Sequence, residues 1–241
     1  MIRWILLLSL PASLISKTGF SQDLPDSLSK KNTNEIILHY NAAMKENLYI
    51  YNGAAYTGSY RKGNGHAYFL TDQAITGTVD FEGIRYVGIA MQYDLILGEL
   101  VVNDYSKNFS LKPDPSKISS FTLDHHRFVH LAGNTSGSGF PGDGYYEELF
   151  SGRRSSVYAR FKKQAVEPSR PDEPLKYFEY VNYYILKDGS FSEISSQNAM
   201  IKAYRDKEKQ VRDFIQSANL NYKKNNSVTL IKLAEFYEQL N

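Results

Sequence analysis

The chain has 241 residues, of which 28 are lysine or arginine and 26 are aspartate or glutamate, so its formal net charge is only +2. This balance argues against a nucleic-acid-binding protein, which needs a strongly basic domain or surface stripe. The absence of cysteine excludes disulfides, a thiolate nucleophile, a cysteine-ligated metal and the lipid-modified cysteine of an exported lipoprotein.

Residues 1–21 have the pattern of a secretory signal peptide. A positively charged start precedes an apolar run over residues 4–15, and Gly19 and Ser21 place small residues at the positions that a signal peptidase recognises. The run is too short for a membrane-spanning helix, which needs roughly 20 apolar residues, and Pro11 interrupts it. We therefore expect cleavage after Ser21, a neutral mature protein in the periplasm or at the cell surface, and no transmembrane span after cleavage.

The mature chain is expected to form one domain. Residues 22–34 are polar and predict a flexible leader, which leaves residues 35–241 for a single domain with a β-rich part (35–194) and a helical part (195–241). A short N-terminal helix is expected at the start of this domain, where apolar residues follow helical spacing. They are Ile36, Ile37, Tyr40 and Met44.

The β-rich part consists of short runs of β-branched and aromatic residues, separated by turn signals such as Glu82-Gly83, Gly98 and Asp188-Gly189. Strands are expected at 78–81, 84–93, 95–102, 118–131, 145–150, 157–161, 177–186 and 191–194. Residues 133–144 and 167–174 predict long loops. The predicted fold class is therefore α+β, with a predominantly antiparallel sheet of meanders and hairpins, arranged as a sandwich or a partly closed barrel.

Two helices are expected after residue 194, and together they form a C-terminal helical hairpin that packs on the sheet. The first has Ser195 or Ser196 as its N-cap, and the second runs from about Val228 to Leu240 with Ser227 at its start. Each has an apolar stripe. The stripes are Met200, Tyr204, Val211, Ile215 and Ala218 in the first helix, and Leu230, Leu233, Tyr237 and Leu240 in the second.

The segment 124–130 contains three histidines and is the candidate for metal or catalytic chemistry. On a strand, His126 and His130 point the same way but lie roughly 13 Å apart, which is too far for one shared ion. Asp124 and His126 are two residues apart on one strand face, so they form the candidate catalytic pair or, with a third ligand such as His66, a metal site. An ordinary hydrogen bond between them is the alternative, and we expect neither a metal nor a cofactor.

Residues 137–142 match the dinucleotide-binding pattern G-x-G-x-x-G, which must follow a strand and open a helix to bind a pyrophosphate. Here Pro141 and Gly142 extend a loop towards a strand, so we expect a mobile connection. Ser136 and Ser138 both lack the flanking glycine that a hydrolase nucleophile elbow requires.

The segment 152–163 carries five positive charges and no negative charge. Alternation along its strand predicts an outer face that combines a tyrosine with cations and suits an anionic partner, such as lipid headgroups or an acidic glycan. The candidate binding surface is Arg153, Arg154, Tyr158, Arg160 and Lys162. In the alternative interpretation, Glu147 and Glu148 balance part of this charge through cross-strand pairs.

A second candidate surface lies on the strand 177–186, which is rich in aromatic residues. Its rings fall on both faces of the strand, so one face is expected in the core while the other could stack on sugar rings. Packing in the core or against a helix is the alternative use. The rings are those of Tyr177, Phe178, Tyr180, Tyr183 and Tyr184.

Local patterns spread over nearly all of the mature chain carry a resemblance. They include Gly77-Thr78-Val79-x-Phe81-x-Gly83, Met91-x-Tyr93-Asp94-Leu95, Phe121-Thr122-Leu123 with His126-x-Phe128-Val129, and Tyr145-Tyr146-Glu147-x-Leu149. The chain resembles a group of exported, strand-rich proteins of Gram-negative bacteria that have a helical C-terminal segment and no assigned activity. The resemblance implies an exported strand-rich fold and assigns no catalytic residue.

From the sequence we expect an exported, non-catalytic binding or assembly module of the cell envelope. Its partner is an envelope protein, a glycan or an anionic lipid surface, and not a nucleic acid. Asp94 is then structural and caps a turn. The alternatives are a periplasmic hydrolase or metal-dependent enzyme that uses Asp124 and His126, and an accessory subunit of a larger envelope complex with residues 22–34 as a spacer.

Overall fold

The computed structural model describes residues 35–37, 48–58, 60, 63–104, 109–133, 138–170 and 172–240. The predicted signal peptide and leader lie outside these residues. Residues 35–37 are helical, and the rest of the predicted N-terminal helix, including Tyr40 and Met44, also lies outside the described part of the chain.

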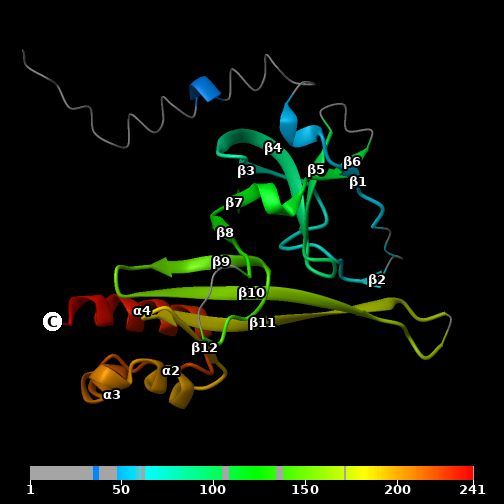
Figure 1. The fold of residues 1–241 in the computed structure, drawn as a ribbon. Coiled ribbons are helices and arrows are strands. Elements are labelled where there is room, and N and C mark those ends of the chain that lie inside the picture. Colours follow the sequence, from blue (N-terminus) through cyan, green and yellow to red (C-terminus); the bar gives the residue numbers. More distant parts are fainter. Residues whose placement is uncertain are drawn as a thin grey trace, which may run out of the picture.

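Within the described residues the strands form one mainly antiparallel sheet, with helices packed on its lower part (Figure 1). The elements in chain order are η2 (Tyr49–Tyr51), β1 (Ala54–Ala55), β2 (Gly63–Asn64), β3 (Ile75–Phe81), β4 (Ile84–Asp94), β5 (Glu99–Asn103), β6 (Ser110–Lys112), η3 (Pro115–Lys117), β7 (Ile118–Leu123), β8 (His126–Leu131), β9 (Gly144–Ser151), β10 (Ser155–Val166), β11 (Leu175–Lys187), β12 (Ser190–Ile194), α2 (Gln197–Ala203), η4 (Arg205–Lys207), α3 (Glu208–Ser217) and α4 (Asn226–Gln239).

The strand order is β1-β6-β5-β4-β3-β7-β8-β9-β10-β11-β12, with β2 parallel to β11. Most neighbours follow one another in the sequence, as a meander requires. The predicted turns at Glu82-Gly83 and Asp188-Gly189 are confirmed, and all four residues have positive φ, as a tight mirror-image hairpin turn demands. The predicted α+β fold with an antiparallel sheet is confirmed, and the sheet is not closed, because β1 and β12 lie at its two edges.

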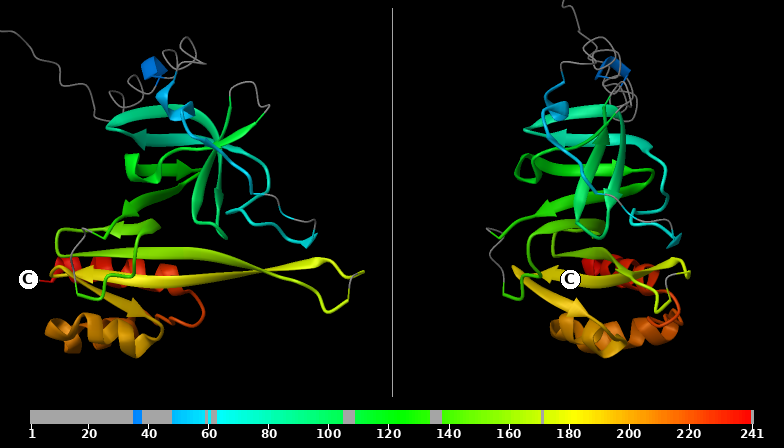
Figure 2. Two further views of the ribbon diagram at one scale, coloured as in Figure 1. Left: turned by 45° about the vertical axis from the view of Figure 1, so that its right-hand side comes forward. Right: turned by 90° about the vertical axis from the view of Figure 1, so that its right-hand side faces the viewer.

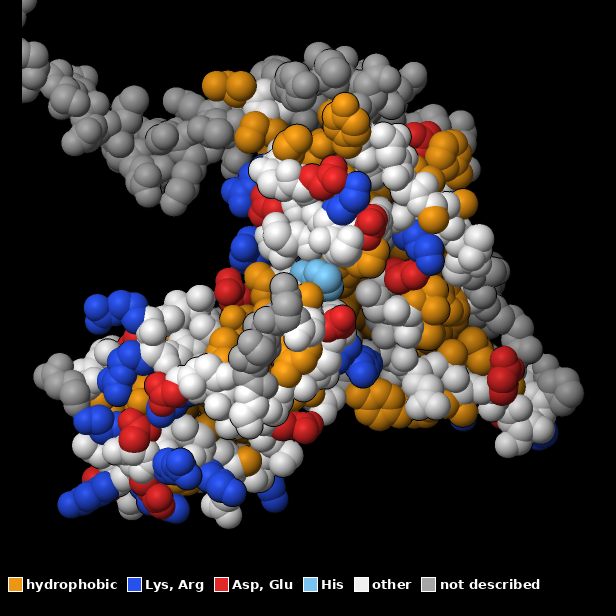
Figure 3. Space-filling model, viewed as in Figure 1, with side chains coloured by type: hydrophobic (Ala, Val, Ile, Leu, Met, Phe, Trp, Pro, Cys, Tyr) orange, Lys and Arg blue, Asp and Glu red, His pale blue; other side chains and the backbone are white. Residues whose placement is uncertain are grey.

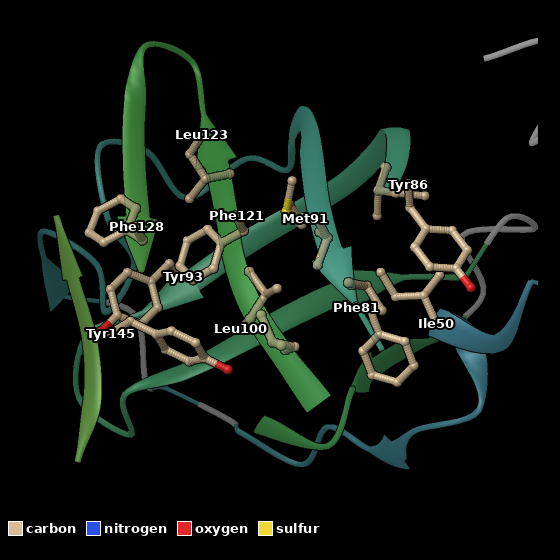
Figure 4. Packing of buried hydrophobic residues seen from close by; sticks show 14 of the residues in the cluster. Ile50, Phe81, Tyr86, Met91, Tyr93, Leu100, Phe121, Leu123, Phe128 and Tyr145 are labelled. Carbon is tan, nitrogen blue, oxygen red and sulfur yellow. The ribbon is translucent and has the colours of Figure 1, made fainter. Parts of the chain in front are cut away.

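The upper part of the sheet, which consists of β1 and β3–β8, curves around the first hydrophobic core. Alternate residues of β4 enter this core, and Ile89, Met91 and Tyr93 are at most 3 % exposed. Figure 4 shows Phe121 of β7 and Phe128 of β8 converging on the same interior, together with Tyr145 of β9. The alternation of apolar and polar residues in the sequence therefore sets which face is buried.

In the lower part of the sheet, β9–β12, both faces are covered where β9 and β12 flank β10 and β11. Val157 and Ile185 point towards the helices and join the second core, in which α4 packs on β9 and β10, and α2 packs on β12. The next residues along each strand point the other way, so Tyr158 and Tyr184 form a third cluster with Tyr146. This arrangement confirms that the last helix belongs to the fold.

Two of the predicted strands are corrected. The predicted strand 95–102 begins only at Glu99, because residues 95–98 form a turn. The predicted strand 118–131 is two strands joined by a turn at Asp124 and His125, where Asp124 has a φ of 55°.

The predicted helical hairpin contains three α-helices, because η4 separates α2 from α3. Ser196 is confirmed as the first N-cap, since its hydroxyl accepts the amide of Ala199. The last helix begins at Asn226, slightly before the predicted start near Ser227 and Val228, and it has Asn225 as its N-cap.

Candidate functional site

The hairpin of β10 and β11 forms an arm that projects beyond the rest of the sheet (Figures 1 and 2). The two strands pair from Ser155 with Lys187 to Val166 with Lys176. Strand β9 borders β10 only as far as Ala159, and β12 borders β11 only from Tyr183. The outer half of the hairpin is therefore two-stranded apart from a short contact with β2, and such a ribbon needs packing on at least one face to be stable.

The inner face of the arm packs against the upper part of the sheet. The ring of Phe161 meets Phe69 edge-on at a centroid distance of 5.0 Å. Lys163 donates from Nζ to the carbonyl of Tyr68 at 2.7 Å and from its backbone N–H to the carbonyl of Leu95 at 3.0 Å. These contacts hold the arm in place.

The outer face of the arm is open to solvent. Directly opposed residues in an antiparallel pair share a face, so three cross-strand rows form this surface. The rows are Lys162 with Tyr180, Gln164 with Phe178, and Val166 with Lys176. All six residues are exposed, including Tyr180 at 51 %, Phe178 at 46 % and Val166 at 38 %, and Figure 3 shows hydrophobic side chains along the lower side of the arm.

Charge is distributed unevenly along the arm. The outer face carries the two cations Lys162 and Lys176. At the tip, Glu167, Asp172 and Glu173 outnumber the single cation Arg170, which pairs with Glu173 at 2.7 Å. The arm thus combines a cationic, aromatic side with an acidic end.

The five residues of the predicted binding surface on β10 do not form one surface in the structure. Lys162 lies on the outer face of the arm, but Tyr158 is only 7 % exposed, because Phe191 of β12 packs on its ring. Phe140, in the loop before β9, packs in turn on Phe191. Arg160 clamps this loop by donating to the carbonyls of Pro141 at 2.9 Å and Asp143 at 2.7 Å. These contacts and the hydrogen bond from the Phe191 amide to the Ser138 carbonyl attach residues 138–143 to the sheet. The mobility of this connection stays a prediction.

Arg153 and Arg154 lie at the opposite end of β10, beside the end of α4. The carboxylate of Glu238 accepts the backbone N–H groups of Arg153, Arg154 and Ser155 at 3.2, 2.9 and 3.0 Å. The guanidinium of Arg154 donates to the carbonyls of Tyr237 and Leu240 and lies 4.2 Å from the Tyr237 ring centroid. We call this arrangement the C-terminal latch.

Glu147 and Glu148 were predicted to neutralise cations of β10, but the structure pairs them with other residues. Glu148 lies 3.4 Å from Arg127, and Glu147 bonds His126, so neither carboxylate pairs with the cations of β10. Next to the latch, a cavity of about 600 Å³ is lined by Arg153, Arg154 and Lys187. Within it, Asp206 accepts from Lys187 at 3.2 Å, which compensates part of the positive charge.

Asp124 and His126 do not form the expected pair. Asp124 lies in the turn and bonds His125 at 2.6 Å, whereas Nδ1 of His126 lies 2.5 Å from Oε1 of the buried Glu147. The prediction failed because a turn, rather than a continuous strand, separates the two residues. His66 lies elsewhere, stacked on Tyr68 at a centroid distance of 6.5 Å.

The buried carboxylate of Asp94 accepts four hydrogen bonds, and we call this arrangement the Asp94 node. The sequence predicted only the role of Asp94 as a turn cap. Its Oδ1 accepts the amides of Ile96 and Leu97 at 2.8 and 3.0 Å, which confirms the predicted turn cap. Its Oδ2 also accepts the hydroxyls of Tyr56 and Tyr60 at 2.6 and 2.5 Å. Burial and these hydrogen bonds raise the pKa of both tyrosines. The two hydrogen bonds also connect the irregular segments that contain Tyr56 and Tyr60 to the end of β4.

In the part of the chain that the structure describes, no group of three or more histidine, aspartate and glutamate residues is arranged to hold a metal ion. None of the described helices has the length and apolar character needed to cross a membrane. Comparison of the chain with protein-family models, with curated proteins and with solved structures finds no match.

Proposed function

We propose that this chain is an exported, non-catalytic binding module of the cell envelope, and that the outer face of the arm binds an acidic glycan. The observation that supports this proposal is the exposure of Phe178, Tyr180 and Val166 beside two lysines on a projecting hairpin. Contiguous exposed apolar groups on a protein surface mark interaction sites.

The spacing of the outer face suits a linear, acidic sugar polymer. Successive same-face rows of a strand lie about 7 Å apart. Phe178 and Tyr180 are thus neighbours on β11 and can stack on consecutive sugar faces, because aromatic rings offer a flat apolar surface. Lys162 and Lys176 lie on opposite strands at the two ends of the patch, where each can pair with a carboxylate of the polymer.

The acidic tip favours a glycan over an anionic membrane. An arm that inserts end-on into a lipid surface brings Glu167, Asp172 and Glu173 to that surface first. Anionic headgroups repel these carboxylates. A polymer that lies along the side of the arm avoids this repulsion.

Binding of the mature protein to polygalacturonate tests the proposal, with neutral dextran and phosphatidylglycerol vesicles as comparison probes. Titration calorimetry should detect binding to polygalacturonate that weakens with salt. Tyr180→Ala and Phe178→Ala should each weaken it about tenfold, which corresponds to about 1.4 kcal/mol, and the double variant Lys162→Glu/Lys176→Glu should abolish it. The matched control is Tyr49→Ala with Lys209→Glu, which alters an exposed tyrosine and an exposed lysine away from the arm.

Three results would contradict the glycan assignment. If the arm variants and the control bind polygalacturonate with equal affinity, the arm does not form the binding site. Preference for the vesicles would replace the glycan by a lipid surface. Absence of binding to every probe would reject the proposal.

Export is tested separately by the intact mass of the protein that cells secrete into the periplasm or medium. Cleavage after Ser21 predicts a species that begins at Gln22. A species that retains residues 1–21 would show that this segment anchors the protein instead.

A further inference from the structure

A cavity distant from the arm lies between the first strands and the upper part of the sheet. Its volume is about 330 Å³, which is within the range of small-molecule pockets. Leu100 and Pro113 contribute apolar walls, and Glu99, Lys112 and Asp114 contribute charges. Tyr145 of β9 also lines it.

Tyr145, which lines this cavity, carries an unsatisfied polar atom. The residue is only 2 % exposed, and its hydroxyl meets no hydrogen-bond partner among the described residues. Its ring is held by Phe121 at 5.0 Å and Tyr93 at 5.8 Å, both edge-on, and it reaches into the core in Figure 4. Burial raises the pKa of this phenol, and nearby Tyr93 and Asp114 act in the same direction, so the hydroxyl stays protonated and remains a donor.

An unpaired buried hydroxyl is unusual, because the large majority of buried polar side-chain atoms have a hydrogen-bond partner. Phenylalanine would fill the same space among these rings without leaving a donor unsatisfied. Because Tyr145 lines the cavity, a molecule bound there can supply the missing partner of this hydroxyl.

The charges around the cavity restrict the chemistry of that molecule. Glu99 is neutralised by Lys112 at 2.8 Å, whereas Asp114, which accepts from Ser116, leaves a net negative charge in the lining. This charge repels an anion. An ammonium group has only donors and cannot accept the proton of the Tyr145 hydroxyl.

We infer that this cavity binds a small neutral molecule with a hydroxyl or carbonyl oxygen on an apolar body, and that Tyr145 donates a hydrogen bond to that oxygen. The apolar body lies against Leu100 and Pro113. This site is independent of the glycan surface on the arm.

Ligand-observed NMR on the full chain tests the inference with four probes of similar shape: benzyl alcohol, toluene, benzylamine and benzoate. Benzyl alcohol should bind most tightly and benzoate most weakly. Tyr145→Phe, which removes only the hydroxyl, should weaken benzyl alcohol about tenfold and leave toluene unchanged, as expected for one hydrogen bond. Ala54→Trp, at an exposed position of the lining, should block all four probes without entering the core.

The melting temperature of Tyr145→Phe without probe distinguishes a ligand-binding role from a structural one. An unpaired hydroxyl predicts a melting temperature that is unchanged or higher, whereas a structural role predicts a lower one. The inference is overturned if the Tyr145→Phe variant melts lower, if it binds benzyl alcohol as the wild type does, if benzoate binds best, or if no probe binds and the cavity holds water alone.

Discussion

The C-terminal latch should contribute measurably to stability, and Glu238→Ala is the substitution that tests it. The Glu238 carboxylate accepts three backbone N–H groups of the turn between β9 and β10. A hydrogen bond to a charged group contributes about 1.5–3 kcal/mol, but water can reach this partly exposed site and replace some of the interaction. The two shorter bonds, taken at the lower end of that range, give an expected loss of about 3 kcal/mol.

Thermal and urea unfolding measure this loss. For a chain of this size, 1 kcal/mol shifts the melting temperature by about 2–4 °C, so Glu238→Ala should melt about 6–12 °C lower. Glu235→Ala is the matched control, because Glu235 is an exposed glutamate of the same helix. The reasoning is refuted if the Glu238 variant melts within 1 °C of the wild type or if the control loses as much.

Gly152 provides a second test of the same geometry. A Cβ at this position would lie 2.5 Å from Oε1 of Glu238 and 2.8 Å from the ring of Phe150. Gly152→Ala should therefore displace the carboxylate and destabilise the protein. Its effect should be smaller in the Glu238→Ala background, because one of the two clashes is then absent.

Three further outcomes are expected. Tyr60→Phe removes a hydrogen bond to the buried carboxylate of Asp94 and should lower the free energy of unfolding by about 1.5–3 kcal/mol in urea titrations; an unchanged midpoint would contradict the role of this node. Burial raises the pKa of Tyr204 to about 12, above its unfolded value of 10.0, so its contribution to stability is complete below pH 10 and is lost as the pH rises towards 12. Tyr204→Phe should flatten the decline that unfolding curves show above pH 10, and an identical decline would disprove the assignment. Arg160→Ala should release residues 138–143 and increase the rate of proteolysis there, whereas a rate equal to that of the wild type would show that other contacts hold the loop.

Local sequence patterns predicted the strands and turns well because their causes are local. Dipeptides such as Asp188-Gly189 tolerate the positive φ of a hairpin turn wherever they occur. The predicted strand through residues 118–131 failed for a related reason. Asp124 adopts a positive φ without a glycine beside it, so no strong turn signal marked the break.

The candidate surfaces were predicted less completely, because the exposure of a strand face depends on what lies across from it. Lys162 was correctly placed on an exposed face, but Val166 and Lys176 were missed, since both lie beyond the predicted ends of their strands. Lys162, Gln164 and Val166 are every second residue of β10 and therefore share one face of the strand. A predicted strand that continued to Val166 would have placed all three on the outer face. Tyr158 was predicted to be exposed and is buried against Phe191, which lies on β12 and is distant in the sequence.

The sequence by itself determined the class of the fold, the positions of most turns, the N-cap at Ser196 and the turn cap at Asp94, because each follows from side-chain periodicity or from hydrogen bonds within a few residues. Only the tertiary structure decided that Tyr56 and Tyr60 complete the Asp94 node, that Glu238 closes the latch, and that Tyr145 lines a cavity while its hydroxyl has no partner among the described residues. These arrangements join residues that lie far apart in the chain. Their existence depends on strand order and on the curvature of the sheet, which arise from packing the whole chain and leave no pattern in any single segment.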